Sequence, residues 1–152
     1  MKLIKFSLII IVISFAACST LILQPADFAW PIESVLKVDN DGSVKEERHS
    51  LTFNTKDLFL EETGDSLGYE GKEIRVIRDD KGFFYITAKN FRNVYVFTDD
   101  EGKLCLDDKI IISEEAVLEN PAFNQRTPYI ELVDGSTKHL LSNEGLKNEE
   151  EE

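Results

Sequence analysis

The sequence predicts a mostly β protein, an antiparallel meander of hairpins that forms a sandwich or a partly closed barrel with one short helix. Short runs in which apolar and polar residues alternate recur along the chain, which is the period of a half-buried strand. Turn sequences rich in Asp, Asn and Gly separate these runs, as is typical of hairpins. A single β domain is expected over residues 29–142, a length of roughly 115 residues that suffices for one core.

About eight to ten short strands are expected, too few for a propeller. The first strand, at 30–38, alternates Trp30, Ile32, Leu36 and Val38 with polar residues. A polar strand follows Gly42 and runs up to Phe53. The other expected strands lie at 73–78, 83–88, 93–98, 103–113, 129–133 and 136–141.

Four turns place glycine where the backbone needs a positive φ. The loops DNDG, DDKG and DDEG end on Gly42, Gly82 and Gly102, which predicts a type I turn followed by a left-handed residue. Asp134-Gly135 lies between the runs YIELV and STKHLL. It predicts a two-residue type I′ loop, in which both positions have positive φ.

One short helix is expected at residues 113–120, SEEAVLEN. Ser113 can cap the first turn, and the two glutamates that follow favour the positive end of the helix dipole. The Asn-Pro pair at 120–121 would end the helix.

KGFFYITA, residues 81 to 88, resembles the RNP1 signature of RNA-recognition domains. That family alternates strands with helices and places its second signature before RNP1, whereas here the similar VYV at 94–96 follows it. Phe84 stands where the family has Gly or Ala, and Ala88 where it has an aromatic residue. The stretch is therefore interpreted as a turn glycine followed by a central strand that is apolar on both faces.

The N-terminal segment has the features of a secretory signal. Lys2 and Lys5 precede an uncharged apolar run that ends in small residues. FAAC, which ends at Cys18, resembles the lipobox of bacterial lipoproteins. The resemblance implies that the Cys18 thiol receives a diacylglycerol, that the signal is cleaved just before Cys18, and that the new amino group is acylated.

This interpretation divides the chain into a signal peptide (1–17), a lipidated tether (18–28), the β domain (29–142) and a disordered acidic tail (143–152). Acyl chains such as palmitate would hold the exported domain at the periplasmic face of the outer membrane or at the cell surface, in preference to the inner membrane. The alternative is an uncleaved membrane-anchoring helix, because residues 6–23 carry no charge. Both interpretations place the β domain outside the cytoplasm.

The chain is acidic, which limits its partners. Its net charge is −12, and loss of Lys2 and Lys5 with the signal changes this to −14. Nucleic acid and anionic lipid surfaces would repel such a protein, whereas a cationic partner or a divalent cation would not. Part of the charge lies in four consecutive glutamates at 149–152, a run that favours disorder.

Metal ligands, cofactors and disulfides are not expected. Paired aspartates at 79–80, 99–100 and 107–108 do not fit the spacing of an EF-hand loop, and Asp side chains commonly bond to their own turn backbone. With Cys18 lipidated, Cys105 has no partner for an intramolecular disulfide. Cys105 is predicted to be a small buried side chain on a strand.

Catalytic residues are not expected either. His49 and His139 are the histidines of the chain, and they lack the spacing of a zinc site. Glu61 and Glu62 near Asp65 could suggest the carboxylate pair of a glycosidase, but surface hairpins are rich in such pairs. The chain is therefore predicted not to be an enzyme.

Two classes of function remain. The first is a lipid-anchored, non-catalytic binding or structural module of the cell envelope, which holds a protein or polymer partner through exposed strand edges or loops. The second is an acidic inhibitor of a cationic hydrolase, because small acidic β lipoproteins such as membrane-bound lysozyme inhibitors are similar in outline. Those inhibitors usually carry a disulfide and a serine-containing signature loop that this sequence lacks, which favours the first class.

Overall fold

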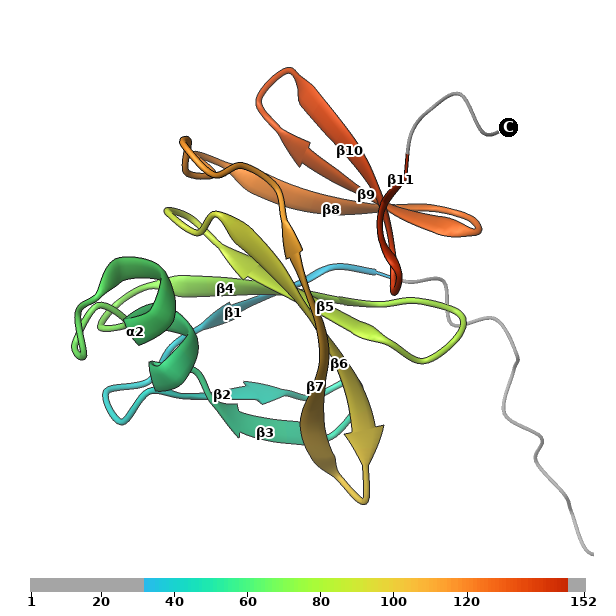
Figure 1. Ribbon diagram of the computed structural model, residues 1–152. Coiled ribbons are helices and arrows are strands. Elements are labelled where there is room, and N and C mark those ends of the chain that lie inside the picture. Colours follow the sequence, from blue (N-terminus) through green and yellow to red (C-terminus); the bar gives the residue numbers. More distant parts are fainter. Residues whose placement is uncertain (1–31, 148–152) are drawn as a thin grey trace, which may run out of the picture.

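The computed structural model describes residues 32–147, which form three antiparallel β-sheets and one short helix (Figure 1). The strands are β1 (Ser34–Lys37), β2 (Ser43–Glu46), β3 (Leu51–Asn54), β4 (Glu73–Arg78), β5 (Phe84–Ala88), β6 (Asn93–Asp100), β7 (Lys103–Ile111), β8 (Pro121–Arg126), β9 (Tyr129–Asp134), β10 (Thr137–Ser142) and β11 (Gly145–Lys147), and the helix is α2 (Lys56–Thr63). The predicted mostly β fold with one short helix is confirmed, and within these residues no sheet closes into a barrel. No helix in this part of the chain has the length and apolar character needed to cross a membrane.

The five-stranded sheet, in the order β1-β4-β5-β6-β7, forms the middle layer. Strands β4 to β7 make the expected meander, each paired antiparallel with the next. All five side chains of β5 are buried, because other layers cover both faces of this sheet. KGFFYITA is thus a turn followed by a central strand, as predicted.

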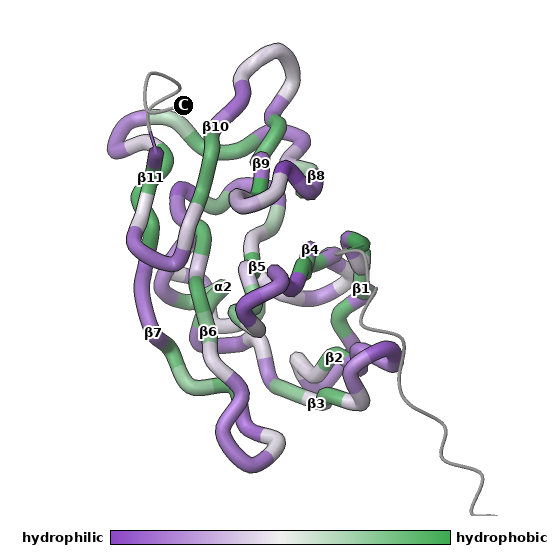
Figure 2. The backbone as a smooth tube through the Cα atoms, turned by 90° about the vertical axis from the view of Figure 1, so that its right-hand side faces the viewer, coloured by the Kyte–Doolittle hydropathy of each residue, from purple (hydrophilic) through white to green (hydrophobic). Residues whose placement is uncertain are grey.

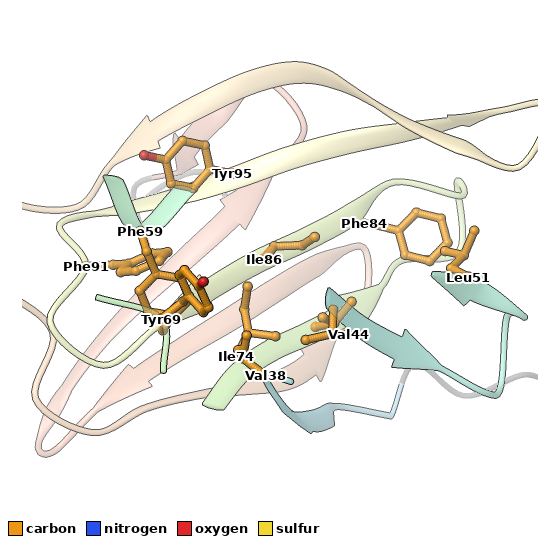
Figure 3. Packing of buried hydrophobic residues seen from close by; sticks show 12 residues of the cluster. Val38, Val44, Leu51, Phe59, Tyr69, Ile74, Phe84, Ile86, Phe91 and Tyr95 are labelled. Carbon is orange, nitrogen blue, oxygen red and sulfur yellow. The ribbon is translucent and has the colours of Figure 1, made fainter. Parts of the chain in front are cut away.

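The hairpin β2–β3 and the helix α2 cover one face of the central sheet (Figure 1). Figure 3 shows Phe59 of α2 against Phe91, and Leu51 of the hairpin beside Phe84. Burial of each large apolar side chain contributes about 1.5 to 3 kcal/mol. The buried residues of this core are Val38, Val44, Leu51, Phe59, Tyr69, Ile74, Val76, Phe84, Ile86, Ala88, Phe91 and Tyr95.

The four-stranded sheet, in the order β11-β10-β9-β8, covers the opposite face and forms a second core with it. The two sheets pack face to face, as in a β-sandwich. Figure 2 shows apolar stretches in β6, β9 and β10 and a hydrophilic tip on the β6–β7 hairpin. The buried residues of this second core are Ile77, Tyr85, Val94, Val96, Ile110, Leu118, Phe123, Ile130, Leu132 and Leu141.

Residues 113–120, here called the strap, are not the helix that the sequence predicted. The Ser113 hydroxyl does accept a capping bond, from the backbone N–H of Ala116 at 2.9 Å. Beyond it, however, the Leu118 N–H donates to the carbonyl of Phe91 and the Leu118 carbonyl accepts from the N–H of Asn90, both at 2.8 Å. These bonds keep the strap out of a helix, because a helix would need the same backbone groups for its own hydrogen bonds.

The helix lies instead at α2, which the sequence did not predict. Phe59 is its one buried side chain, so its apolar face is narrow and its sequence pattern is weak. The helix ends at Gly64, which adopts the left-handed conformation typical of a C-terminal cap.

The turns DNDG and DDKG have the predicted geometry. Gly42 and Gly82 lie in the left-handed region, with φ values of 81° and 99°. Their N–H groups donate to the carbonyls of Asp39 at 2.9 Å and Asp79 at 3.2 Å, which closes each turn.

The loops at the ends of β6 and β9 differ from the prediction. Between β6 and β7 the loop consists of Glu101 and Gly102, both with positive φ, which is the type I′ pattern predicted elsewhere. Between β9 and β10 the loop is Gly135 and Ser136, and only Gly135 has positive φ, as a type II′ turn requires. The type I′ prediction was wrong here because Asp134 still belongs to β9.

The single polar strand expected up to Phe53 is two strands, β2 and β3, separated by a turn at residues 47–50. The carboxylate of Glu46 accepts a hydrogen bond of 2.6 Å from the backbone N–H of His49. This bond satisfies a turn donor and lets the chain reverse direction.

Strands β8 and β11 were not predicted. β11 lies within the segment 143–152 that was expected to be disordered. It pairs with β10, so that Lys147 lies opposite Leu140 and Gly145 lies opposite Ser142. Ordered β structure therefore extends to Lys147, while residues 148–152 lie outside the described part of the chain.

Cys105 was predicted to be buried, and this prediction is wrong. The thiol is exposed on β7, and within residues 32–147 it has no disulfide partner. Cys105 lies opposite Thr98, near the tip of the β6–β7 hairpin, where the exposure of both strands rises.

Candidate functional site

Cys18, the predicted lipid-attachment residue, lies outside the described residues. The same is true of the signal segment 1–17 and the tether 18–28. The structure therefore describes only the β domain, which lipid on this cysteine would anchor.

In two of the aspartate pairs, the first aspartate stabilises a turn. The Oδ1 atom of Asp79 accepts hydrogen bonds from the backbone N–H groups of Lys81 at 3.0 Å and Phe83 at 2.8 Å. Asp99 accepts in the same way from Gly102 at 2.9 Å. Within residues 32–147 no three His, Cys, Asp or Glu side chains are grouped so that they could hold a metal ion.

Glu62 links the end of α2 to the central sheet, whereas the neighbouring Glu61 has a different partner. Glu61 instead forms an ion pair of 2.8 Å with Lys109. Burial, and then the bond to Glu62, raise the pKa of the Tyr95 phenol. The carboxylate of Glu62 accepts hydrogen bonds from Arg92 N at 2.7 Å, Asn93 Nδ2 at 2.7 Å and Tyr95 Oη at 2.9 Å.

The two histidines lie in different places. His49 packs edge-on against the ring of Phe84, with centroids 5.3 Å apart. Burial lowers the pKa of His49, although the nearby Glu46 carboxylate raises it. His139 is half-buried on β10 and lines a hollow beside the strap.

The strap separates two hollows at the end of the central sheet where β4 begins and β5 ends. Asp134 clamps one end of the strap: its carboxylate accepts from the N–H groups of Glu119 at 3.0 Å and Asn120 at 2.6 Å. Together with the bonds of Leu118 to the β5–β6 turn, this clamp fixes the wall between the hollows.

The first hollow, here called the cationic hollow, has a volume of about 340 Å³, within the range of ligand sites. Lys72 directly precedes β4, Lys89 directly follows β5, and Asn120 belongs to the strap. It is lined by Gly71, Lys72, Glu73, Arg75, Lys89, Asn90, Asn120 and Pro121.

Two lysines give this hollow its free positive charge. The Arg75 guanidinium forms an ion pair of 2.9 Å with the Glu33 carboxylate. That carboxylate also accepts a hydrogen bond from the backbone N–H of Phe123. Lys72 and Lys89 form no hydrogen bond or ion pair through their ammonium groups within residues 32–147. With one unpaired carboxylate, Glu73, on the rim, the hollow can bind an anionic group.

Asn90 shapes the turn that carries Lys89. Its φ of 72° lies in the left-handed region, which few residues other than glycine adopt. The Phe91 N–H donates to the Ala88 carbonyl at 3.2 Å, so Asn90 occupies the third position of a tight turn. This conformation directs Lys89 and Asn90 to the same hollow.

A separate acidic surface lies at the opposite end of the central sheet. Residues near the tips of the β4–β5 and β6–β7 hairpins line one shallow hollow there, formed by Arg78, Lys81, Gly82, Phe83, Thr98 and Asp99. Of the acidic residues of these tips, Asp80, Asp100 and Glu101 form no hydrogen bond through their side chains within residues 32–147.

The chain shows no match to known proteins in three comparisons. No family model, no curated protein and no solved structure matches it.

Sequence reasoning did not identify the basic residues of the hollows. Lys72, Lys89 and Arg92 are isolated basic residues in an acidic chain and form no motif. The tight turn at Asn90 and the strap bring the other lining residues of the hollows close to these side chains. Neither the conformation of this turn nor that of the strap was predicted. The one usable signal was the pair Lys89-Asn90 between two strand patterns, which marks a turn.

Proposed function

We propose that this protein is a lipid-anchored, non-catalytic binding module of the bacterial cell envelope. Lipid on Cys18 would hold it at the periplasmic face of the outer membrane or at the cell surface. Its β domain would bind a protein or polymer partner through an anionic group that enters the cationic hollow. The observation that carries the proposal is the pair Lys72 and Lys89, two ammonium groups without partners in the described part of an otherwise acidic chain.

Non-catalytic binding is supported by the use of the candidate catalytic groups. Glu61 and Glu62 stabilise the contact between α2 and the sheet. Asp79 and Asp99 stabilise turns. Within residues 32–147 every buried side-chain polar atom has a hydrogen-bond partner, so no buried polar group awaits a reacting molecule.

The first prediction concerns Cys18. The wild-type protein from its own host is expected to begin at Cys18 and to carry the mass of a diacylglycerol plus one amide-linked acyl chain, because two or more chains are needed for firm membrane attachment. Cys18→Ala is expected to lose this mass and to keep the signal segment. Intact-mass spectrometry checks both results.

Fractionation alone does not distinguish these species, because the uncleaved apolar run can also hold the chain in a membrane. If the wild-type protein begins at Met1, the lipoprotein interpretation is wrong and the uncleaved anchor helix takes its place. A start at another residue without acyl mass would indicate an ordinary secreted protein.

The second prediction concerns the cationic hollow. The double variant Lys72→Gln, Lys89→Gln is expected to weaken partner binding at least about tenfold, because each charge-assisted hydrogen bond contributes about 1.5 to 3 kcal/mol. Envelope extract is passed over the acylated protein, the retained partner is identified by mass spectrometry, and its affinity is then measured for each variant.

The matched control is Lys45→Gln, Lys103→Gln, which removes the same charge from strands β2 and β7, away from the hollow. This control is expected to bind like the wild type. Equal losses in both double variants would mean that overall charge, and not the hollow, governs binding.

The second candidate function is inhibition of a cationic hydrolase, and the carboxylates of Asp80, Asp100 and Glu101, which have no partner within residues 32–147, favour it. Such a complex would weaken strongly with salt, because exposed charges are screened. It would also be lost in the variant Asp80→Asn, Asp100→Asn, Glu101→Gln and retained in the lysine variant. The binding module predicts the reverse response to these two sets of substitutions.

A further inference from the structure

The second hollow beside the strap has a different chemistry from the cationic hollow. Its volume is about 310 Å³, and residues of three segments form its walls. Arg92 follows the β5–β6 turn, Ser113 and Val117 belong to the strap, and Thr137 and His139 belong to β10. The remaining lining residues are Ile112, Ala116, Leu118 and Asp134.

Asp134 and Ser113 already use their acceptor atoms in this hollow. Both carboxylate oxygens of Asp134 accept hydrogen bonds from backbone N–H groups of the strap. The hydroxyl oxygen of Ser113 accepts from the N–H of Ala116. Its O–H donor, like that of Thr137, has no acceptor within residues 32–147.

Arg92 differs from the other arginines of the described chain. The guanidinium of Arg92 donates no hydrogen bond and forms no ion pair within residues 32–147. Its hydrogen bonds are all made by the backbone: the N–H donates to Glu62, and the carbonyl accepts from the N–H groups of Ile112 and Ser113. The other arginines bond through their side chains, Arg48 to Ile32 O, Arg75 to Glu33, Arg78 to Gly82 O and Arg126 to Glu131. Because an arginine fork matches a carboxylate with two parallel bonds, this free guanidinium is suited to a carboxylate.

One side of the hollow is apolar. Val117 is exposed there to 39% of its possible area, and Ile112 and the buried Leu118 lie beside it in the lining. An apolar body placed against these side chains would remove both surfaces from water.

We propose that this hollow binds a small organic carboxylate that carries an apolar body. The carboxylate accepts bonds from the Arg92 guanidinium, with further donors available from His139, Ser113 and Thr137, and the apolar body covers Val117. Several donors of this hollow are free and its one carboxylate is already bonded, so the hollow suits a group that only accepts. This site is separate from the cationic hollow, since the strap stands between them.

The test is a titration of the full-length, ¹⁵N-labelled protein with hexanoate, in which NMR monitors the backbone signals of the β domain. Saturable shifts are expected at Val117, Arg92 and His139. Hexanol, which has the same chain without the carboxylate, is expected to bind at least about tenfold more weakly. Arg92→Gln is expected to weaken hexanoate binding by a similar factor, because it removes a charge-assisted bond.

Arg126→Gln is the matched control, because Arg126 lies on β8 in an ion pair with Glu131. It is expected to bind hexanoate like the wild type, as is the variant Lys72→Gln, Lys89→Gln. The thermal melting of each variant checks that the domain is folded. Three results would overturn the proposal: equal affinity for hexanoate and hexanol, equal losses of affinity in the two arginine variants, or chemical-shift changes confined to the cationic hollow. None of them would contradict the proposed function, which rests on Lys72 and Lys89.

Discussion

Replacement of Phe91 by alanine is expected to lower the free energy of unfolding by about 3 to 5 kcal/mol, the range for a fully buried phenylalanine. Phe91 is 0% exposed and lies in the first core. Its ring meets Phe59 at 5.0 Å and Tyr95 at 6.2 Å, both in edge-on geometry. The substitution removes both ring contacts and leaves a cavity between helix and sheet (Figure 3).

Urea denaturation measures this change. Since a domain of this size has a stability of about 5 to 15 kcal/mol, the variant should retain only part of it. Leu67→Ala is the control, because Leu67 is 59% exposed and its loss should change stability by less than about 0.5 kcal/mol. Similar effects of the two substitutions would contradict the role of Phe91 as the link between α2 and the sheet.

The central strands could be predicted because their signals are local. β4 was predicted with its observed bounds, since EIRVIR is bounded by a polar loop and by DDKG. β5 is apolar on both faces because it lies in the middle of a covered sheet, and a continuous apolar run indicates this.

The strap shows why other segments could not be predicted. Its sequence has a cap, acidic residues and a stop, all of which favour a helix. In the fold, Leu118 is buried in the second core and its backbone bonds to the β5–β6 turn. These contacts come from residues distant in sequence and outweigh a propensity of less than about 1 kcal/mol per residue.

The hollows depend on the same non-local contacts. Arg92 and His139 are 47 positions apart in the sequence, and the packing of the two sheets brings both to one hollow. No spacing rule relates them, because Arg92 lies in the β5–β6 connection of the central sheet and His139 on β10 of the four-stranded sheet. The sequence shows that acidic residues outnumber basic ones. It does not show which basic side chains lack an acidic partner, because the three-dimensional structure decides this.

The stability of the domain is expected to fall steeply above about pH 10, the ordinary pKa of a tyrosine. Tyr85 and Tyr95 are both buried, and burial raises the pKa of each phenol well above that value. The bond from Tyr85 to Asp79 at 3.1 Å and that from Tyr95 to Glu62 at 2.9 Å act in the same direction, because each carboxylate favours the protonated phenol.

The direction follows from the protons bound in each state. Below about pH 10 both tyrosines are protonated in the folded and unfolded chains, and their contribution to stability is fully present. Above it the unfolded chain loses these protons and the folded chain keeps them, so unfolding becomes more favourable as the pH rises. The expected slope is about 1.4 kcal/mol per pH unit for each tyrosine.

Urea denaturation at intervals from pH 8 to pH 11.5 measures this slope in the wild type, in Tyr95→Phe and in the double variant Tyr85→Phe, Tyr95→Phe. At pH 8 Tyr95→Phe is expected to be less stable by about 1 to 3 kcal/mol, because Glu62 loses one donor. Above pH 10 this deficit should shrink, since the variant has no phenol to hold protonated at this position. The slope that remains in the double variant reports lysines such as Lys109, whose pKa the Glu61 ion pair raises and whose exposure limits its effect. If all three proteins lose stability with the same slope, the buried phenols do not set the alkaline limit of the fold.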